Sequence, residues 1–185
     1  MTYNFTSFVD LDINQINEVF ELRNKSYVKE QMKNPSYISY QAHISFIKSL
    51  QSNKYSKYFL VQKETKKKSL RTVGVYSITS INTEGAEGGF YITEYAINNS
   101  LSIEFIYFSL KFVFENFSIN KIYGNMLVSN RKALRLNNFF EFDVLNKNFF
   151  EGKEYLHSEL TKDKWLNQVA NRSDIIYLLK FTANQ

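Results

Sequence analysis

The stretch that decides the fold of this chain is Asn130-Arg-Lys-Ala133-Leu-Arg-Leu-Asn137-Asn-Phe-Phe140-Glu-Phe142. It directly follows a strand-like run, and we expect Asn130 to end that strand and cap a helix over Arg131–Phe139. Asparagine suits this position because its side-chain oxygen accepts a hydrogen bond from a free amide of the first helical turn. Ala133 and Leu136 are spaced to face inward from such a helix. The stretch therefore predicts a strand, a capped helix and a Phe-rich turn.

Length and composition indicate a packed globular protein. The chain has 185 residues, 44% of them hydrophobic and 17% aromatic, which is enough for one well-filled core. We therefore predict a single domain over residues 1–185. The absence of cysteine excludes structural disulfides, thiolate catalysis and Cys-ligated zinc. The two histidines, His43 and His157, are not spaced like metal ligands, so we expect no metal.

The chain shows no membrane-targeting pattern. Its first ten residues lack the basic segment and apolar run of a signal peptide. The most apolar segment, Leu101–Phe117, is interrupted by Glu104, Lys111 and Glu115, which favours a core helix over a membrane span. We therefore expect a cytoplasmic protein without a membrane partner.

The net charge of +5 suits an anionic ligand or a merely basic surface. Much of the surplus lies in Lys63–Arg71, between two strand-like runs, Tyr58–Gln62 and Thr72–Thr79. This position is typical of a solvated hairpin turn. Because no nucleic-acid-reading motif accompanies the lysines, we expect no nucleic-acid partner.

Hydrophobic periodicity gives the order of the remaining elements. Helices are predicted over Asp12–Arg23, Ser26–Met32, Ser39–Leu50, Ser102–Phe117 and Arg131–Phe139. Strands are predicted over Tyr58–Gln62, Thr72–Ile81, Ala86–Thr93, Lys121–Val128, Asp143–Phe150 and Ile175–Phe181. The pattern in Lys153–Asn171 is weak, apart from a short helix around Trp165. This order predicts an α/β fold, a mixed sheet with helices packed on its faces.

The opening stretch resembles the last block of the GCN5-related N-acetyltransferases, N-x-x-A-x-x-x-Y-x-x-x-G-F. Asn130, Ala133 and Phe142 match this block, whereas Asn137 stands at its Tyr and Glu141 at its Gly. The resemblance implies the acyl-CoA N-acyltransferase fold, which has the same element order as the pattern above.

Further matches, spread over roughly residues 10–160, are similar to the nucleotide-sugar N-acetyltransferases of the pseudaminic acid pathway. They are Leu22-Arg23-Asn24, Met32, Ser39-x-x-x-His43-x-x-Phe46-x-x-Ser49-Leu50, Tyr58–Val61, Val73–Val75, Ser77–Asn82 and Ala86–Ile92. The resemblance implies transfer of an acetyl group from acetyl-CoA to the 4-amino group of a UDP-linked 4-amino-4,6-dideoxy sugar, for flagellin or surface glycan. Two alternatives stay open: acylation of a protein N-terminus or small amine, and a degenerate, non-catalytic binding protein.

The resemblance also implies four residues of the nucleotide-sugar pocket: Arg23, His43, Phe46 and Thr79. An arginine makes charge-assisted bonds to a diphosphate, and the imidazole and hydroxyl groups can bond phosphate or sugar oxygens. Phe46 can stack on a uracil or pack against the 6-deoxy carbon. The alternative is that Arg23 caps its own helix and Phe46 belongs to the core.

For acetyl-CoA, the resemblance implies a splayed strand at Tyr91–Tyr95 that offers amides to pantetheine. A turn over Ala96–Ser102 would hold the pyrophosphate, because oriented amides and the helix dipole attract anions. Ser100, Leu101 and Ser102 stand in place of the family's glycines, and we expect the Leu101 side chain to narrow the approach of the pyrophosphate. The implied donor contacts are Ile92, Thr93, Asn98, Asn99, Ser100, Ser102, Asn130 and Asn137.

Two acid–base groups that relatives carry are missing here. Asn137 replaces the Tyr that protonates the leaving thiolate, and Asn125 stands where relatives carry Glu. An amide cannot titrate usefully, so we expect Glu87 and Tyr91 to serve instead, with His43 a further option. Glu87 and Tyr91 lie on one face of their strand because side chains alternate. The alternative is that Tyr91 is core and Glu87 pairs with a basic neighbour.

Exposed aromatic residues near Phe139–Phe150 indicate either a homodimer contact or the end of the core.

Overall fold

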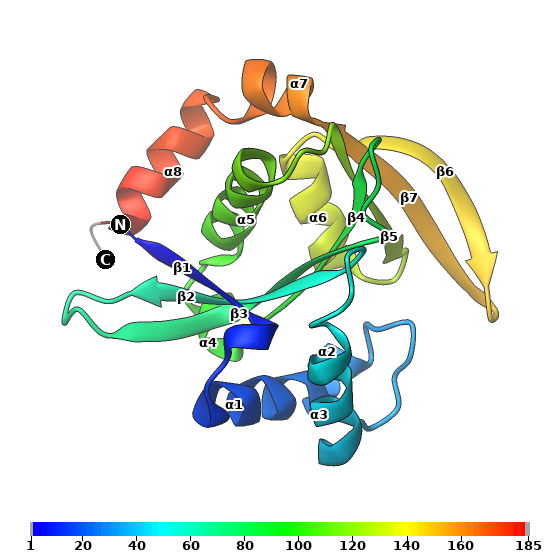
Figure 1. Ribbon diagram of the computed structural model, residues 1–185. Helices are drawn as coiled ribbons and strands as arrows, with labels where there is room; N and C mark the ends of the chain where they lie inside the picture. Colours follow the sequence, from blue (N-terminus) through cyan, green and yellow to red (C-terminus); the bar gives the residue numbers. More distant parts are fainter. Residues whose placement is uncertain (1, 184–185) are drawn as a thin grey trace. The chain divides into compact units, whose positions relative to one another are not determined.

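The computed structural model describes residues 2–183 (Figure 1). The chain divides into two compact units, which are described separately. The first unit comprises Met1–Thr79 with Gly89–Asn99, and the second comprises Ser80–Gly88 with Ser100–Gln185. Strand β4 (Ala86–Ile92) begins in the second unit and ends in the first.

The other elements follow the chain. The first unit contains β1 (Tyr3–Ser7), a 3-10 turn (Phe8–Asp10), α1 (Ile13–Asn24), α2 (Ser26–Lys29), α3 (Tyr40–Ser49), β2 (Lys57–Glu64), β3 (Leu70–Thr79) and α4 (Glu94–Asn98). The second unit contains α5 (Ser102–Asn116), β5 (Lys121–Leu127), α6 (Arg131–Phe139), β6 (Asp143–Phe150), β7 (Lys153–Thr161), α7 (Lys162–Lys164), a π-helical turn (Trp165–Val169) and α8 (Ser173–Ala183).

The strands form a mixed sheet in the hydrogen-bonded order β1-β2-β3-β4-β5-β7-β6, which confirms the predicted fold class. The pairs β1–β2, β2–β3, β5–β7 and β6–β7 are antiparallel. The pair β4–β5 is parallel, and its ladder joins only Ala86 to Ile122 and Glu87 to Tyr123. β5 continues to Leu127 beyond the last of these pairs.

Capped helices pack on the core of the first unit. Asp12 and Gln15 form a capping box at the start of α1, and Ser39 caps α3 as predicted. Both helices contribute to one hydrophobic cluster with β2 and β3. Its buried members are Phe8, Val19, Ile47, Leu50, Leu60 and Val75.

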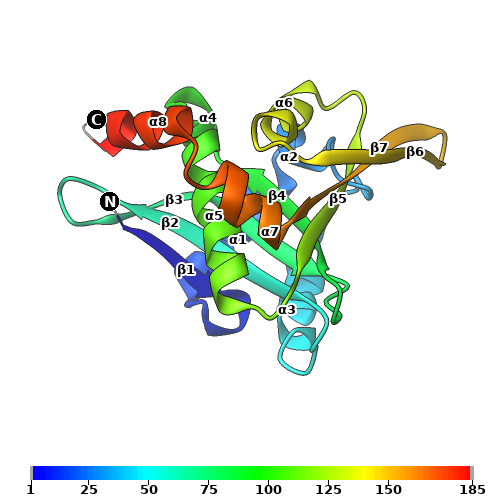
Figure 2. The same cartoon turned by 90° about the horizontal axis from the view of Figure 1, so that it is seen from above.

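In the second unit, α5 carries the core. Phe105, Val113 and Phe114 on this helix are almost completely buried. The Trp165 ring stacks on Phe114 with 6.2 Å between centroids, so the segment after β7 packs on α5. β7 pairs with β5 on one side and with β6 on the other, and the β6–β7 hairpin can be followed in Figure 2.

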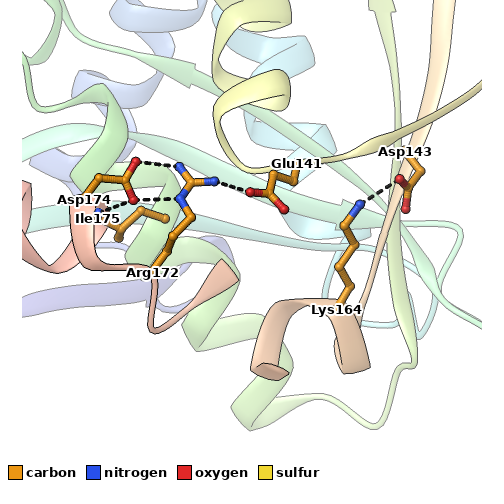
Figure 3. Close-up of polar contacts among 6 residues, drawn as sticks. All are labelled: Glu141, Asp143, Lys164, Arg172, Asp174 and Ile175. Atoms are coloured by element: carbon orange, nitrogen blue, oxygen red, sulfur yellow. Dashed lines mark hydrogen bonds and ion pairs between the residues drawn. The ribbon is translucent and has the colours of Figure 1, made fainter. Parts of the chain in front are cut away.

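Ion pairs join the C-terminal segments of the second unit to the turn after α6 and to the first residue of β6 (Figure 3). Arg172 Nη1 donates to Glu141 Oε1 at 2.6 Å, and its Nε donates to Asp174 Oδ1 at 2.7 Å. Lys164 Nζ likewise lies 2.7 Å from Asp143 Oδ1. The bonds from Arg172 lower the pKa of Asp174.

Three predictions of secondary structure need correction. Strands β1 and β7 were not predicted. β1 has only five residues and so shows little periodicity, and the hydrophobic pattern of the β7 segment is weak. The strand predicted at Ile175–Phe181 is wrong, since these residues lie in helix α8. The mostly apolar segment Ile175–Phe181, interrupted by Lys180, fits either element. In the structure Asp174 lies in the first turn of α8, where a carboxylate interacts favourably with the helix dipole.

Among the described residues, no helix has the length and apolar character needed to span a bilayer.

Candidate functional site

An arginine with an unsatisfied guanidinium nitrogen lies in the first unit. Arg23 occupies the last turn of α1, and its Nη2 donates to the backbone oxygen of Asn34 at 3.0 Å. Its Nη1 is buried and has no hydrogen-bond partner among the described residues. Burial lowers the pKa of Arg23, and interaction with the Tyr91 phenol opposes this shift. An arginine remains charged at neutral pH, so this nitrogen favours an anion.

A buried histidine presents a second unsatisfied nitrogen. His43 on α3 is only 4% exposed, and its ring lies 5.7 Å from that of Phe20. The Nε2 atom is buried without a partner among residues 2–183. Desolvation lowers the pKa of His43, with an opposing contribution from a bond to the backbone of Ile16. The ring is therefore held neutral, with unused hydrogen-bonding capacity.

His43 should make stability depend on pH. Because its pKa is lowered in the folded state, the unfolded chain binds the extra proton first as pH falls below the ordinary value of 6.5. The contribution of neutral His43 to the free energy of unfolding is therefore fully present above about pH 6.5 and is lost as the pH falls below that value. The loss amounts to about 1.4 kcal/mol for each pH unit by which the pKa is lowered. We expect the melting temperature to drop more steeply between pH 7.5 and 5.5 in the natural chain than in His43→Gln. Equal slopes in thermal melts would contradict this assignment.

Aromatic residues connect the other predicted substrate contacts of the first unit. Phe46 is 38% exposed and meets Tyr58 edge-to-face, with centroids 5.0 Å apart, so it is not a core residue. Tyr91 packs against the hydrophobic cluster, and desolvation raises its pKa, which keeps the phenol neutral. Thr79 is the last residue of β3 and is half-buried.

The end of β4 is already engaged in hydrogen bonds within the first unit. The carbonyl of Ile92 accepts from the Tyr27 hydroxyl at 3.2 Å. The amide of Thr93 donates to the carbonyl of Val73 at 2.9 Å, and the Thr93 hydroxyl accepts from the amide of Ala96 at 3.2 Å. Thr93 thus caps α4, and its amide is not open to a pantetheine carbonyl.

The turn predicted over Ala96–Ser102 is shorter than expected. Residues 96–98 belong to α4, so Asn98 is helical, and Asn99 is the C-cap of that helix. Ala96 is completely buried, and the Thr93 cap begins the helix before it. Only residues 99–101 form the turn. The Asn99 side chain bonds back to the carbonyl of Tyr95 at 2.8 Å.

The start of α5 has free amides in its first turn. Ser102 is the first helical residue, and the preceding N-cap, Leu101, makes no side-chain capping bond. Leu101 is only 4% exposed, so its side chain lies in the core. Ser100 adopts a left-handed φ of 57°. A 15-residue helix without a side-chain cap offers amides and a positive dipole end to an anion.

The stretch Asn130–Phe142 contains the predicted helix, α6. Asn130 Oδ1 accepts from the amide of Ala133 at 3.1 Å, which confirms the predicted cap. Asn137 Nδ2 donates to Ser158 Oγ on β7 at 2.9 Å, so its amide has a structural partner. Glu141, at the family's Gly position, has a φ of 55°. This left-handed conformation explains why the family prefers glycine there.

Glu87 belongs to a polar row in the second unit. Its Oε1 accepts from Asn125 Nδ2 at 3.2 Å, and Asn125 Oδ1 lies 3.0 Å from His157 Nδ1. The sequence did not point to His157, because its contact with Asn125 depends on the register of β7 against β5. Among residues 2–183, no group of three or more His, Asp or Glu side chains could hold a metal ion.

The structure thus brings the predicted residues into separate groups. Arg23, His43, Phe46 and Tyr91 lie in the first unit, as do Thr79, Ile92, Thr93, Asn98 and Asn99. Glu87, Ser100, Ser102, Asn130 and Asn137 lie in the second. Within the first group, Arg23 and Tyr91 interact electrostatically. Within the second, Glu87 contacts Asn125.

No family model matches the chain. The chain is 29% identical over 153 residues to acetyltransferase PseH of Campylobacter jejuni subsp. jejuni serotype O:23/36 (strain 81-176), covering 82% of this chain and 88% of that one. The structure of Campylobacter jejuni N-acetyltransferase PseH in complex with acetyl coenzyme A has a TM-score of 0.65 and 23% identity, covering 87% of this chain and 99% of that one. Spermidine N-acetyltransferase from Vibrio cholerae, in complex with CoA and spermine, has a TM-score of 0.76 and 20% identity, covering 89% and 98%. The structural likenesses establish a shared fold.

Proposed function

We propose that this member of the GCN5-related N-acetyltransferase superfamily, similar to PseH, acetylates the amino group of a nucleotide-linked amino sugar. The chain is an acetyl-CoA-dependent N-acetyltransferase, in keeping with its acetyltransferase relatives. The proposed part is the acceptor, a UDP-4-amino-4,6-dideoxy sugar used for flagellin or surface glycan. Cytoplasmic location, a single domain and a homodimer complete the proposal.

The observation that carries this proposal is the buried Nη1 of Arg23, which has no partner among the described residues. A buried guanidinium nitrogen is costly unless an acceptor satisfies it. A diphosphate supplies such acceptors, together with the charge that arginine prefers. His43 Nε2 adds a second unsatisfied position, and exposed Phe46 offers a ring for the base or the 6-deoxy carbon. These features support an anionic, partly aromatic acceptor.

The runner-up is a small amine, because spermidine N-acetyltransferases have the same fold. A polyamine carries several positive charges and would meet an arginine and a chain of net charge +5. Charge complementarity therefore favours the nucleotide sugar. A protein N-terminus and a non-catalytic binding role are the remaining alternatives.

The donor requirements fit the start of α5. Its uncapped first turn, with Ser100 and Ser102 beside it, would hold the pyrophosphate of acetyl-CoA. Asn130 and Asn137 would contribute to donor binding by positioning α6. Asn130 caps this helix, and Asn137 anchors it to Ser158. Acetyl-CoA supplies an acyl group activated as a thioester. Thr93 would contribute only indirectly, as the cap of α4 directly after β4, since its amide already donates to the carbonyl of Val73.

Within the proposal, the side chains of this protein move and hold protons. The Glu87 carboxylate accepts a proton from the substrate ammonium, which exposes the lone pair on nitrogen. Tyr91 remains a neutral hydroxyl because desolvation raises its pKa, so it serves as a hydrogen-bond donor. Alignment of amine and thioester provides much of the rate gain.

Thermal shift measurements test this function. At about 100 times their dissociation constants, acetyl-CoA and UDP should each stabilise the natural chain by about 2.7 kcal/mol, or about 5–10 °C. Arg23→Gln should lose the UDP shift while keeping the acetyl-CoA shift. Arg71→Gln is the matched control, because Arg71 is exposed and stacks on Tyr95 at 3.6 Å.

Three outcomes would redirect the proposal. Stabilisation by acetyl-CoA and spermidine, but not by UDP, would favour the small-amine reading. No response to acetyl-CoA or CoA would favour the non-catalytic reading. Loss of the UDP shift in both arginine variants would show a general charge effect in place of a site.

A further inference from the structure

Three polar side chains form a hydrogen-bonded row on neighbouring strands of the second unit. Glu87 lies on β4, Asn125 on β5 and His157 on β7. The register sets Asn125 opposite His157 and Glu87 opposite Tyr123. Residues that are opposite one another, or two apart on one strand, share a face of the sheet. The Tyr123 ring, 5.8 Å from that of His157, lies beside the row.

The chemistry of the row fixes the tautomer of the histidine. An ionised carboxylate only accepts, so the NH2 group of Asn125 must face Glu87. This orientation turns the Asn125 carbonyl oxygen toward His157, and a carbonyl oxygen also only accepts. Nδ1 of His157 must therefore carry a hydrogen. In the neutral ring, Nε2 then presents its lone pair.

The Nε2 atom of His157 has no hydrogen-bond partner among the contacts described for residues 2–183. The side chain is half-buried, so it is shielded and still reachable by a small molecule. β7 also pairs with β6, and there the residue opposite His157 is Asn146, which is exposed. The arrangement orients one ring nitrogen and leaves the other as a proton acceptor.

Acetyl transfer from an ammonium substrate removes two protons from the nitrogen, and one of them ends on the departing thiolate. A substrate ammonium carries three hydrogens and the product amide carries one, so two protons leave the nitrogen. Glu87 is the acceptor assigned to the first proton. Asn137 cannot titrate, and the Tyr91 phenol is already protonated. The second proton lacks an acceptor among these residues.

We propose that His157, oriented by Asn125 and Glu87, accepts the second proton through Nε2; this inference rests on the proposed function. The amine, freed of one proton by Glu87, attacks the thioester carbon and a C–N bond forms. The cationic nitrogen passes its second proton to His157. The C–S bond then breaks, and the departing thiolate takes that proton from the imidazolium. Glu87 releases its proton to water, so the products are the amide, CoA thiol and one proton.

Nitrogen-15 NMR of the histidine rings tests the orientation without any substrate. The chain has only two histidines, so His43→Gln assigns the signals of His157. We expect neutral His157 to carry its hydrogen on Nδ1. Asn125→Ala should shift the population toward Nε2–H, whereas the matched control Asn146→Ala should leave it unchanged. An Nε2–H ring in the natural chain, or no response to Asn125→Ala, would overturn the inference.

Chemical rescue tests the proton transfer. His157→Ala should lower kcat by about 100-fold, at the lower end of general-base effects, and added imidazole should restore part of it. The KM for acetyl-CoA should stay within about twofold. Unchanged kcat, or a loss that imidazole does not restore, would show that His157 accepts no proton. Failure of the proposed sugar substrate would give a different result. The natural chain would then be inactive with UDP-amino sugars, while the neutral ring of His157 would still carry its hydrogen on Nδ1.

Discussion

Replacing Glu87 with Gln should lower kcat for acetyl transfer by about 10²- to 10⁴-fold, the usual contribution of a general base. The substitution removes the proton acceptor and keeps an oxygen that can accept from Asn125, whose Nδ2 lies 3.2 Å from Glu87 Oε1. The row to His157 should therefore survive. Binding of acetyl-CoA and UDP should change little. Steady-state kinetics with a circular dichroism check of folding will measure the effect.

Glu84→Gln is the matched control for this prediction. Glu84 lies three residues before Glu87 in the chain, is exposed, and has its backbone amide in the Asn82 turn. Its substitution also removes one negative charge but should leave kcat within about twofold. If Glu87→Gln retained full turnover and an unchanged pH–rate profile, the carboxylate would not be the proton acceptor.

Replacing Gly74 with Ala should strongly destabilise the fold, because β3 and β4 approach closely at this glycine in the first unit. A Cβ atom at Gly74 would overlap the backbone oxygen of Tyr91 and lie 3.0 Å from the Cα of Ile92. Backbone atoms cannot yield as a flexible side chain can. We expect Gly74→Ala to destabilise the fold by about 3 kcal/mol, the upper range for overpacking. For a chain of this size, the melting temperature should fall by about 6–12 °C.

Gly124→Ala provides the comparison. A Cβ at Gly124 has its nearest neighbour, the oxygen of Gly88, at 3.8 Å, which is an ordinary contact. The same chemical change should therefore cost less than about 1 kcal/mol. Equal melting temperatures for the two alanine variants would show that β3 and β4 do not approach as described.

Much of the fold was predictable because local chemistry and tertiary structure agree. Asn130 supplies a side-chain cap, and α6 spans Arg131–Phe139 as the sequence indicates. Ser39 likewise caps α3, since its side chain accepts from the amide of Ala42. The predictions failed where local signals are weak or ambiguous. The pattern of Ile175–Phe181 suits a strand or a helix, and the structure places these residues in α8, with Asp174 in its first turn.

The candidate site was predictable only in part, because hydrogen bonding between strands depends on register. The resemblance pointed to Arg23 and His43, but only the structure reveals their unsatisfied nitrogens. His157 lay outside the prediction since β7 itself was not recognised. The capping role of Thr93, which shortens the predicted turn, likewise appears only once α4 is formed.

Mass spectrometry of the reaction of the purified chain with acetyl-CoA and a UDP-4-amino-4,6-dideoxy sugar tests the proposed activity directly. Spermidine serves as the competing acceptor in the same tube. We predict a sugar nucleotide heavier by one acetyl group and no acetylated spermidine. Acetylated spermidine with unmodified sugar nucleotide would contradict the proposed acceptor, and no acetylated product of any kind would contradict the enzymatic assignment.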